Sequence, residues 1–122
     1  MLEYSKEQAM DDKAKIDMTI YELQAEISKT LAHPIRLAIL HSLRDGEKTV
    51  NELTEMLGAR QSNLSQHLSL MVSSGILLQR KEGTGVYYKL ATEKIATACR
   101  IMREVLIENL KKQSELITLM EN

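Results

Sequence analysis

The fold of this 122-residue chain is decided by residues 58–75, which read GARQSNLSQHLSLMVSSG. Here Leu64, Leu68 and Met71 recur at spacings of four and three, the repeat of one buried helix face. The other side of the same helix carries small hydrogen-bonding residues, namely Gln61, Ser62, Ser65, Gln66 and Ser69. Gly58 and Gly75 bracket the segment, which predicts a helix over 61–73 preceded by a tight link.

Two more helices are predicted ahead of this segment. The single proline, Pro34, opens an apolar run that ends at the turn Asp45-Gly46, and proline is favoured in a first helical turn. Thr49 and Glu52 have the spacing of a capping box, which predicts a short helix closed by Gly58. Two helices around a tight glycine link form a helix-turn-helix.

A β-hairpin is predicted to follow this pair of helices. Residues 76–81 and 86–90 are β-prone, and the Gly-rich segment 82–85 between them is typical of a turn. Arg80 and Lys81 flank the tip. A basic hairpin placed directly after a helix-turn-helix is the arrangement called a wing.

Long amphipathic helices are expected at both ends of the chain. One apolar stripe starts at Ile16 and continues to Leu31, and Thr92 is expected to cap a last helix that reaches about residue 119. Residues 1–15 are either an arm or an extension of the first helix, and residues 16–122 form one winged-helix domain. Because a small central domain cannot cover both stripes, we expect the two helices to pair with those of a second copy.

The predicted fold class is therefore mainly α, with about five helices and a two-stranded wing. A content of 43% hydrophobic and 27% charged residues is that of a globular protein. The net charge is only −1, but residues 58–90 contain four basic residues and one acidic residue. A locally basic segment in a near-neutral chain is expected where one edge of a domain meets phosphates.

The polar helix and the basic hairpin together predict recognition of double-stranded DNA. Gln, Asn and Ser side chains donate to and accept from base edges, so the candidates for sequence readout are Gln61, Ser62, Asn63, Ser65 and Gln66. Basic side chains suit phosphates or the minor groove, and these candidates are Arg60, Arg80, Lys81 and Lys89. The glycines beside Thr84 allow the hairpin tip to approach the sugar-phosphate chain closely.

The order of these motifs resembles the arsenic-repressor (ArsR) family of winged-helix regulators. The matching segments are LAHPIRLAIL at 31–40, QSNLSQHL at 61–68, GIL at 75–77 and GVYYKL at 85–90. The resemblance implies a homodimer that binds an inverted-repeat operator and acts as a repressor released by an effector. His67 belongs to the family pattern; it is counted among the DNA-contacting candidates and is not interpreted as a metal ligand.

The sequence departs from the metal-sensing members of that family. Residues 49–55 contain no cysteine, where such members carry a pair, and no Asp or His follows His67. We therefore predict no metal site and no cofactor. Redox-sensing relatives that close a disulfide within one subunit need two cysteines, and Cys99 is alone. The effector, a small molecule or an oxidant, is left open.

Cys99 has two possible interpretations. Cys99 is either a buried core or interface residue or a thiol that reacts with an oxidant or with its symmetry mate. Ser65 and His67 lack a third orienting group and an oxyanion loop, so we predict that the protein is not an enzyme.

Two alternatives to an ArsR-type repressor are kept. One is a regulator of another winged-helix family, such as the multiple-antibiotic-resistance type, and the other is a protein-interaction module. The chain has no membrane-spanning run and no secretion signal, which predicts a cytoplasmic protein.

Overall fold

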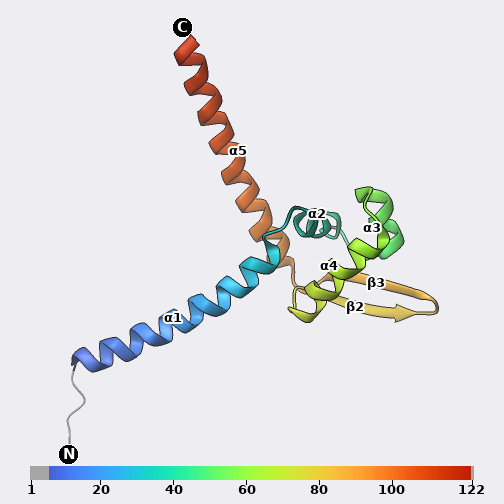
Figure 1. Ribbon diagram of the computed structural model, residues 1–122, viewed down its shortest axis with the longest axis horizontal. Helices are drawn as coiled ribbons and strands as arrows, with labels where there is room; N and C mark the ends of the chain where they lie inside the picture. The colour runs from blue at the N-terminus through green and yellow to red at the C-terminus, as the bar shows by residue number, and fades with distance from the viewer. Residues whose placement is uncertain (1–5, 122) are drawn as a thin grey trace, which may run out of the picture.

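The computed structural model describes residues 6–121, with side chains from residue 17 onward. Over this range the chain forms five helices and three strands, confirming a mainly helical winged helix-turn-helix. In chain order they are α1 (Lys6–Leu31), α2 (Pro34–Ser42), β1 (Lys48–Thr49), α3 (Val50–Leu57), α4 (Gln61–Ser73), β2 (Leu77–Glu82), β3 (Gly85–Leu90) and α5 (Glu93–Glu121). Figure 1 shows the middle elements gathered together and the terminal helices projecting from them.

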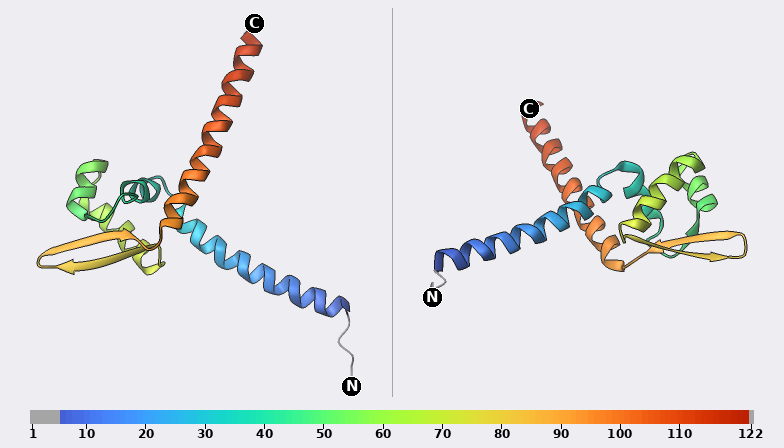
Figure 2. Two further views of the ribbon diagram at one scale, coloured as in Figure 1. Left: turned by 180° about the vertical axis from the view of Figure 1, so that it is seen from behind. Right: turned by 60° about the horizontal axis from the view of Figure 1, so that its bottom comes forward.

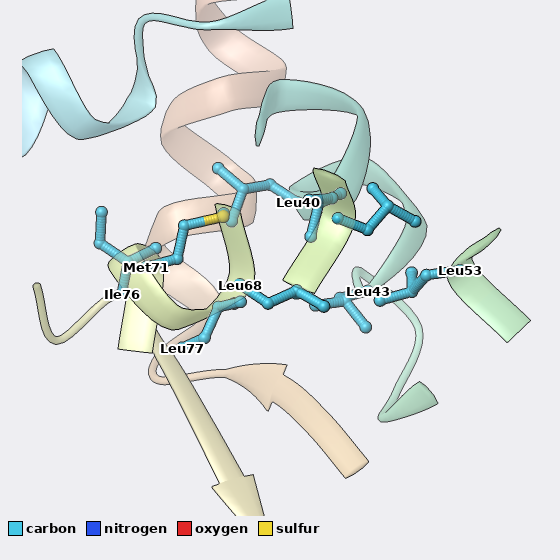
Figure 3. Close-up of a cluster of buried hydrophobic side chains, with 9 residues drawn as sticks. Leu40, Leu43, Leu53, Leu68, Met71, Ile76 and Leu77 are labelled. Atoms are coloured by element: carbon cyan, nitrogen blue, oxygen red, sulfur yellow. The ribbon is translucent and has the colours of Figure 1, made fainter. Parts of the chain in front are cut away.

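One cluster of buried side chains holds the middle elements together. α2, α3, α4 and the start of the hairpin all contribute to it (Figure 3). Its members are Ile39, Leu40, Leu43, Leu53, Leu64, Leu68, Met71, Ile76 and Leu77, each at most 3% exposed. Burying an aliphatic side chain of this size contributes about 1.5–3 kcal/mol, so this cluster is the main source of the domain's stability.

The ends of the short helices follow the local chemistry of the sequence. The His33 ring accepts a hydrogen bond from the Ile35 amide and so caps α2. Thr49 and Glu52 form the predicted capping box, with each side chain bonded to the other residue's backbone N–H. α4 spans 61–73 as predicted, and Gly75 follows it with φ +79°, a conformation that favours glycine.

The sheet has three strands, whereas two were predicted. β3 lies in the centre, and β1 pairs with it through Lys48 opposite Tyr88 and Thr49 opposite Tyr87. A two-residue strand is too short to show a period in the sequence. Both strands of the hairpin reach one residue further toward the tip than expected, because Glu82 pairs with Gly85 and leaves only a two-residue loop.

The terminal helices leave the core in different directions (Figure 2). α1 already begins at Lys6, so residues 6–15 continue the first helix, and residues 1–5 lie outside the described part. From Asp17 to Lys29 every α1 side chain is exposed, and α5 is exposed from Arg100 onward. Large apolar side chains such as Leu23, Val105 and Leu106 are among them. In the isolated chain these stripes therefore have no covering surface.

Candidate nucleic-acid interface

The tight link between α3 and α4 sets the direction of the predicted reading helix. Gly58 adopts φ +64° and its amide donates to the Thr54 carbonyl at 2.9 Å, which ends α3. A left-handed residue at this point favours glycine because a Cβ would be strained. α4 starts three residues later and packs on α3 through the buried Leu53 and Leu64.

The core contacts of α4 determine which of its sides faces outward. Leu64, Leu68 and Met71 are fully buried. Ser62, Gln66 and Ser69 lie on the opposite side of the helix and are exposed, since successive residues are rotated by about 100°. Gln61 and Asn63 in the first turn are exposed as well, and Ser65 at the edge is half-buried. Ser69 extends this face by one turn beyond the predicted set of readout residues.

The beginning of α4 is open to a ligand. Arg60 is the N-cap, and its exposed side chain makes no capping hydrogen bond to the first turn. The first backbone N–H groups of a helix have no partner within the helix, and the helix dipole adds partial positive charge there. This end of α4 therefore has the chemistry of an anion-binding site.

His67 lies on the inner flank of α4, away from Ser62 and Gln66. Its Nδ1 accepts a hydrogen bond from Arg36 Nε at 3.1 Å, and its ring lies 4.5 Å from the ring of His33. Arg36 also donates to the carbonyl of Thr30 at 3.1 Å. This group of four residues, the α1–α2–α4 joint, connects the end of the first helix to the reading helix. Burial, His33 and Arg36 together lower the pKa of His67.

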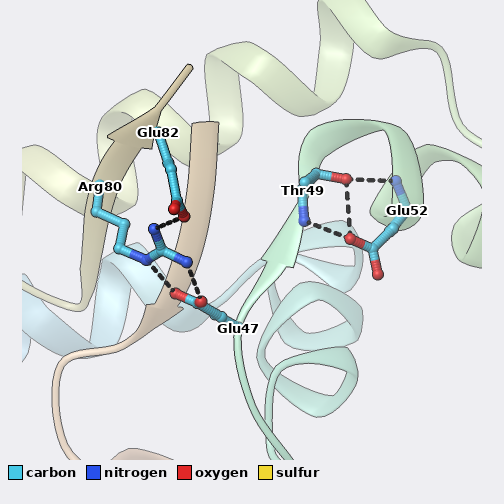
Figure 4. Close-up of polar contacts among 5 residues, drawn as sticks. All are labelled: Glu47, Thr49, Glu52, Arg80 and Glu82. Atoms are coloured by element: carbon cyan, nitrogen blue, oxygen red, sulfur yellow. Dashed lines mark hydrogen bonds and ion pairs between the residues drawn. The ribbon is translucent and has the colours of Figure 1, made fainter. Parts of the chain in front are cut away.

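Arg80 joins the wing to the segment before β1 (Figure 4). Its guanidinium makes two bonds to Glu47, at 3.0 and 2.5 Å, and one to Glu82 at 2.5 Å. The guanidinium carbon also lies 4.4 Å from the centre of the Tyr87 ring. The hydrogen bond from Arg80 lowers the pKa of Glu47 and keeps it ionised. The positive charge of Arg80 is therefore already matched by two carboxylates.

Strand register places the remaining wing residues on two faces. Lys81 and Gln79 share a face with Leu77, which is buried in the core. Lys89 lies opposite Leu78 on the other face, together with Arg80. The side chains of Lys81 and Lys89 are exposed and form no ion pair within the described residues. Gly83, with φ +60°, makes the two-residue loop and leaves Thr84 exposed at the tip.

The structure thus brings some of the predicted site residues together and separates others. Ser62 and Gln66 share the exposed side of α4, and Gln61, Asn63 and the N-cap Arg60 are exposed around the start of the helix. His67 is instead engaged in the joint, and Arg80 is bonded to Glu47 and Glu82. Glu47 and Arg36 were missed by the sequence reasoning, because their partners are 33 and 31 residues away.

Cys99 lies on the first turns of α5, half-buried against the core. Burial raises the pKa of its thiol above the ordinary value, only partly opposed by Arg103. Thiol reactivity requires the thiolate, so this environment favours the unreactive form. Within the described residues, no cluster of three or more His, Cys, Asp or Glu side chains is arranged to hold a metal ion, and no helix is suited to crossing a membrane.

A helix-turn-helix with an outward polar helix and a three-stranded wing defines a winged-helix DNA-binding regulator. Residues 33–77 match the family model described as "Bacterial regulatory protein, arsR family". The HTH-type transcriptional regulator Rv0081 of Mycobacterium tuberculosis is 39% identical over 71% of this chain and 77% of its own. The chain belongs to the ArsR family of transcriptional regulators, and not to another winged-helix family.

Further relatives and solved structures agree with this assignment. The biofilm growth-associated repressor of Agrobacterium fabrum is 43% identical over 59% of this chain and 62% of its own. The crystal structure of Rv0081 has a TM-score of 0.70 at 37% identity, covering 77% of this chain and 95% of that one. The homodimeric winged helix-turn-helix domain of Mb0332 from Mycobacterium bovis has a TM-score of 0.70 at 30% identity. The match covers 79% of this chain and 89% of that one.

The α1–α2–α4 joint predicts a loss of stability in acid. The pKa of His67 lies below 6.5, so the unfolded chain binds more protons than the folded chain as pH falls past that value. Protonated Nδ1 would also place a donor against the Arg36 donor. We expect the free energy of unfolding, measured in urea at fixed protein concentration, to fall between about pH 7 and about pH 5.

The variant His67→Asn should make this fall shallower. His41, whose pKa is lowered by burial and by Arg44 and Arg103, is a second contributor, so His41→Asn is the matched comparison. An unchanged pH dependence in His67→Asn would show that the joint does not rely on a neutral imidazole.

Proposed function

We propose that the protein is a homodimeric repressor that reads an inverted-repeat DNA operator with α4 and is released by an effector. The observation that carries the proposal is the exposed polar face of Ser62, Gln66 and Ser69, opposite the buried Leu64 and Leu68. An α-helix of this kind fits the major groove of B-DNA. The family's role in DNA-dependent regulation supports the same site.

Base readout is assigned to the first two turns of α4. The side-chain amides of Gln and Asn carry both donors and an acceptor, which complement the N7 acceptor and the N6 donor that adenine presents in the major groove. Ser62 and Ser65 add hydroxyls that accept or donate. The readout set is Gln61, Ser62, Asn63, Ser65 and Gln66.

Phosphate contacts are assigned to the groups whose charge is unmatched. Arg60 and the uncapped start of α4 lie at one end of the polar face, and Lys81 extends from the side of the wing that carries Leu77. Lys89 and the backbone at Thr84 supply further contacts. Arg80 is given a different role, because Glu47 and Glu82 already hold it: it positions the wing.

The dimer is supported by the apolar stripes on α1 and α5. Side chains such as Leu23, Met102 and Val105 are 44–67% exposed in the single chain. Exposed stripes of this length mark a protein–protein interface. The similar winged helix-turn-helix domain of Mb0332 is homodimeric. A twofold axis would present two α4 helices about 34 Å apart, which is one turn of B-DNA. We further propose that the protein acts in the cytoplasm and has no enzymatic activity.

Sequence readout by α4 is tested with a labelled inverted repeat selected from the DNA upstream of the gene. Gln66→Ala should reduce the preference for the selected operator over a substituted one by about 1–3 kcal/mol at the base that Gln66 reads. Gel-shift titrations at fixed salt measure this difference. Thr97→Ala, which removes an exposed side chain outside the proposed interface, should leave the preference unchanged. Equal preferences in wild type and Gln66→Ala would remove Gln66 from the readout set.

Lys81 and Arg80 are expected to respond differently to salt. Lys81→Gln should lower the slope of log K against log salt by about one, because one phosphate contact is lost. Arg80→Gln should weaken binding to all sequences with little change in slope, since its charge is matched by Glu47 and Glu82. A loss of slope in Arg80→Gln equal to that in Lys81→Gln would make Arg80 a direct phosphate ligand.

The dimer interface is tested at Val105 on the exposed apolar stripe of α5. Val105→Glu places a charge where a second copy would pack, so we expect a monomer in sedimentation and loss of tight binding to the full operator. Lys111→Glu makes a larger charge change on another side of α5 and should remain dimeric. If Val105→Glu sediments as the wild type does, α5 does not form the interface.

A further inference from the structure

A pocket of about 300 Å³ lies between the end of α2 and the base of α5. Leu40, Ala96 and the half-buried Cys99 give it an apolar floor. Exposed polar side chains form the rim, namely His41, Arg44, Asp45, Arg100 and Arg103. Its volume falls at the lower end of the roughly 300–1,000 Å³ of small-molecule sites, and an apolar floor with a few polar groups is their usual composition.

The rim carries an excess of positive charge. Three guanidinium groups face the single carboxylate of Asp45. Arg44 lies 3.7 Å from Asp45, and Arg100 lies 2.7 Å from Glu104 on the next turn. Both ion pairs are solvent-exposed and hence weak, so a ligand carboxylate can replace either acid. Arg103 forms no ion pair with any residue in the described part of the chain.

The pKa values of the titratable groups in the pocket are consistent with this excess of positive charge. Burial lowers the pKa of His41, and Arg44 and Arg103 lower it further, more than Asp45 raises it. The Cys99 thiol, whose pKa is raised by burial, stays neutral and adds no negative charge. The positive charge of the pocket is therefore not balanced from within.

The pocket lies beside the exposed apolar stripe of α5. Ala96, Cys99, Arg100 and Arg103 are three or four residues apart and share one side of the helix. At about 100° per residue, the exposed Val105 lies about 160° or more around the helix from the mean direction of these residues, whereas the exposed Leu106 and Leu110 lie within about 70° of it. A ligand in the pocket and a second copy of the chain on the stripe would therefore approach α5 from adjoining sides.

We propose that this pocket binds a small organic carboxylate. The Arg103 guanidinium holds the carboxylate, Arg44 and Arg100 add to the positive field, and the apolar part of the ligand lies on Leu40 and Ala96. Guanidinium groups bind carboxylates through paired hydrogen bonds, so a rim with three arginines suits a carboxylate ligand. The ligand bridges α2, which is part of the core beneath α4, and α5. The proposal does not depend on DNA binding.

The single cysteine supplies a direct test in the full-length protein. Alkylation of Cys99 by iodoacetamide is followed by mass spectrometry with benzoate, with its neutral amide benzamide, or with sodium chloride at matched ionic strength. Benzoate should slow the reaction in a saturable way, by about tenfold at nine times its Kd for one-site protection. Benzamide and chloride should protect weakly or not at all.

Variants on the same helix assign the protection to the pocket. Arg103→Gln should raise the Kd for benzoate about tenfold or more, as expected when a hydrogen bond to a charged group is lost. Lys94→Gln removes an exposed charge from the first turns of α5 outside the pocket and should leave the Kd unchanged. For each variant, the rate of Cys99 alkylation with ligand is compared with the rate of the same variant without ligand, which removes direct effects of the substitution on the thiol. Arg44→Gln provides a second variant within the pocket. Absent protection, equal protection by benzamide, or protection unaffected by both arginine variants would overturn the proposal.

Discussion

The burial of Leu64, Leu68 and Met71 is the constraint on which the rest of this structure depends. These three side chains fix the rotation of α4 about its axis, because turning the helix would expose them and bury polar groups without partners. Ser62 and Gln66 are therefore presented outward as a consequence of the core. A regulator of this type needs no separate device to orient its reading helix: the hydrophobic effect on one side determines what is displayed on the other.

The wing follows a second constraint, which is electrostatic. A net charge of −1 leaves little positive charge to attract DNA, and the fold uses one arginine internally. By binding Glu47 and Glu82, Arg80 fixes the hairpin to the segment before β1 and leaves Lys81 and Lys89 as its unmatched cations. The wing is thus held in place by an arginine whose charge is no longer available to DNA. Arg80 positions the hairpin, and Lys81 and Lys89 supply the positive charge that can attract phosphates.

How much the sequence predicts depends on whether a contact is local. The bounds of α4, the Thr49 capping box and the glycine link are set by residues at most a few positions apart, and these predictions were confirmed. β1 and the pairing of Arg80 with Glu47 were missed, since partners more than thirty residues apart leave no local pattern. His67 illustrates the same limit: its place on α4 was predicted, but its partner Arg36 lies on α2.

The α1–α2–α4 joint physically connects the first helix, α1, to the helix proposed to read DNA, α4. Arg36 contacts the last turn of α1 through the Thr30 carbonyl and the reading helix through His67, so one planar side chain spans both. The two bonds leave different nitrogens of one planar guanidinium, so a change in the direction of α1 would disturb the geometry of at least one of them. If α1 packs in the dimer as proposed, the spacing of the two α4 helices is coupled to the state of that interface. In such a dimer, an effector that shifted the terminal helices would change the fit of the two α4 helices to DNA.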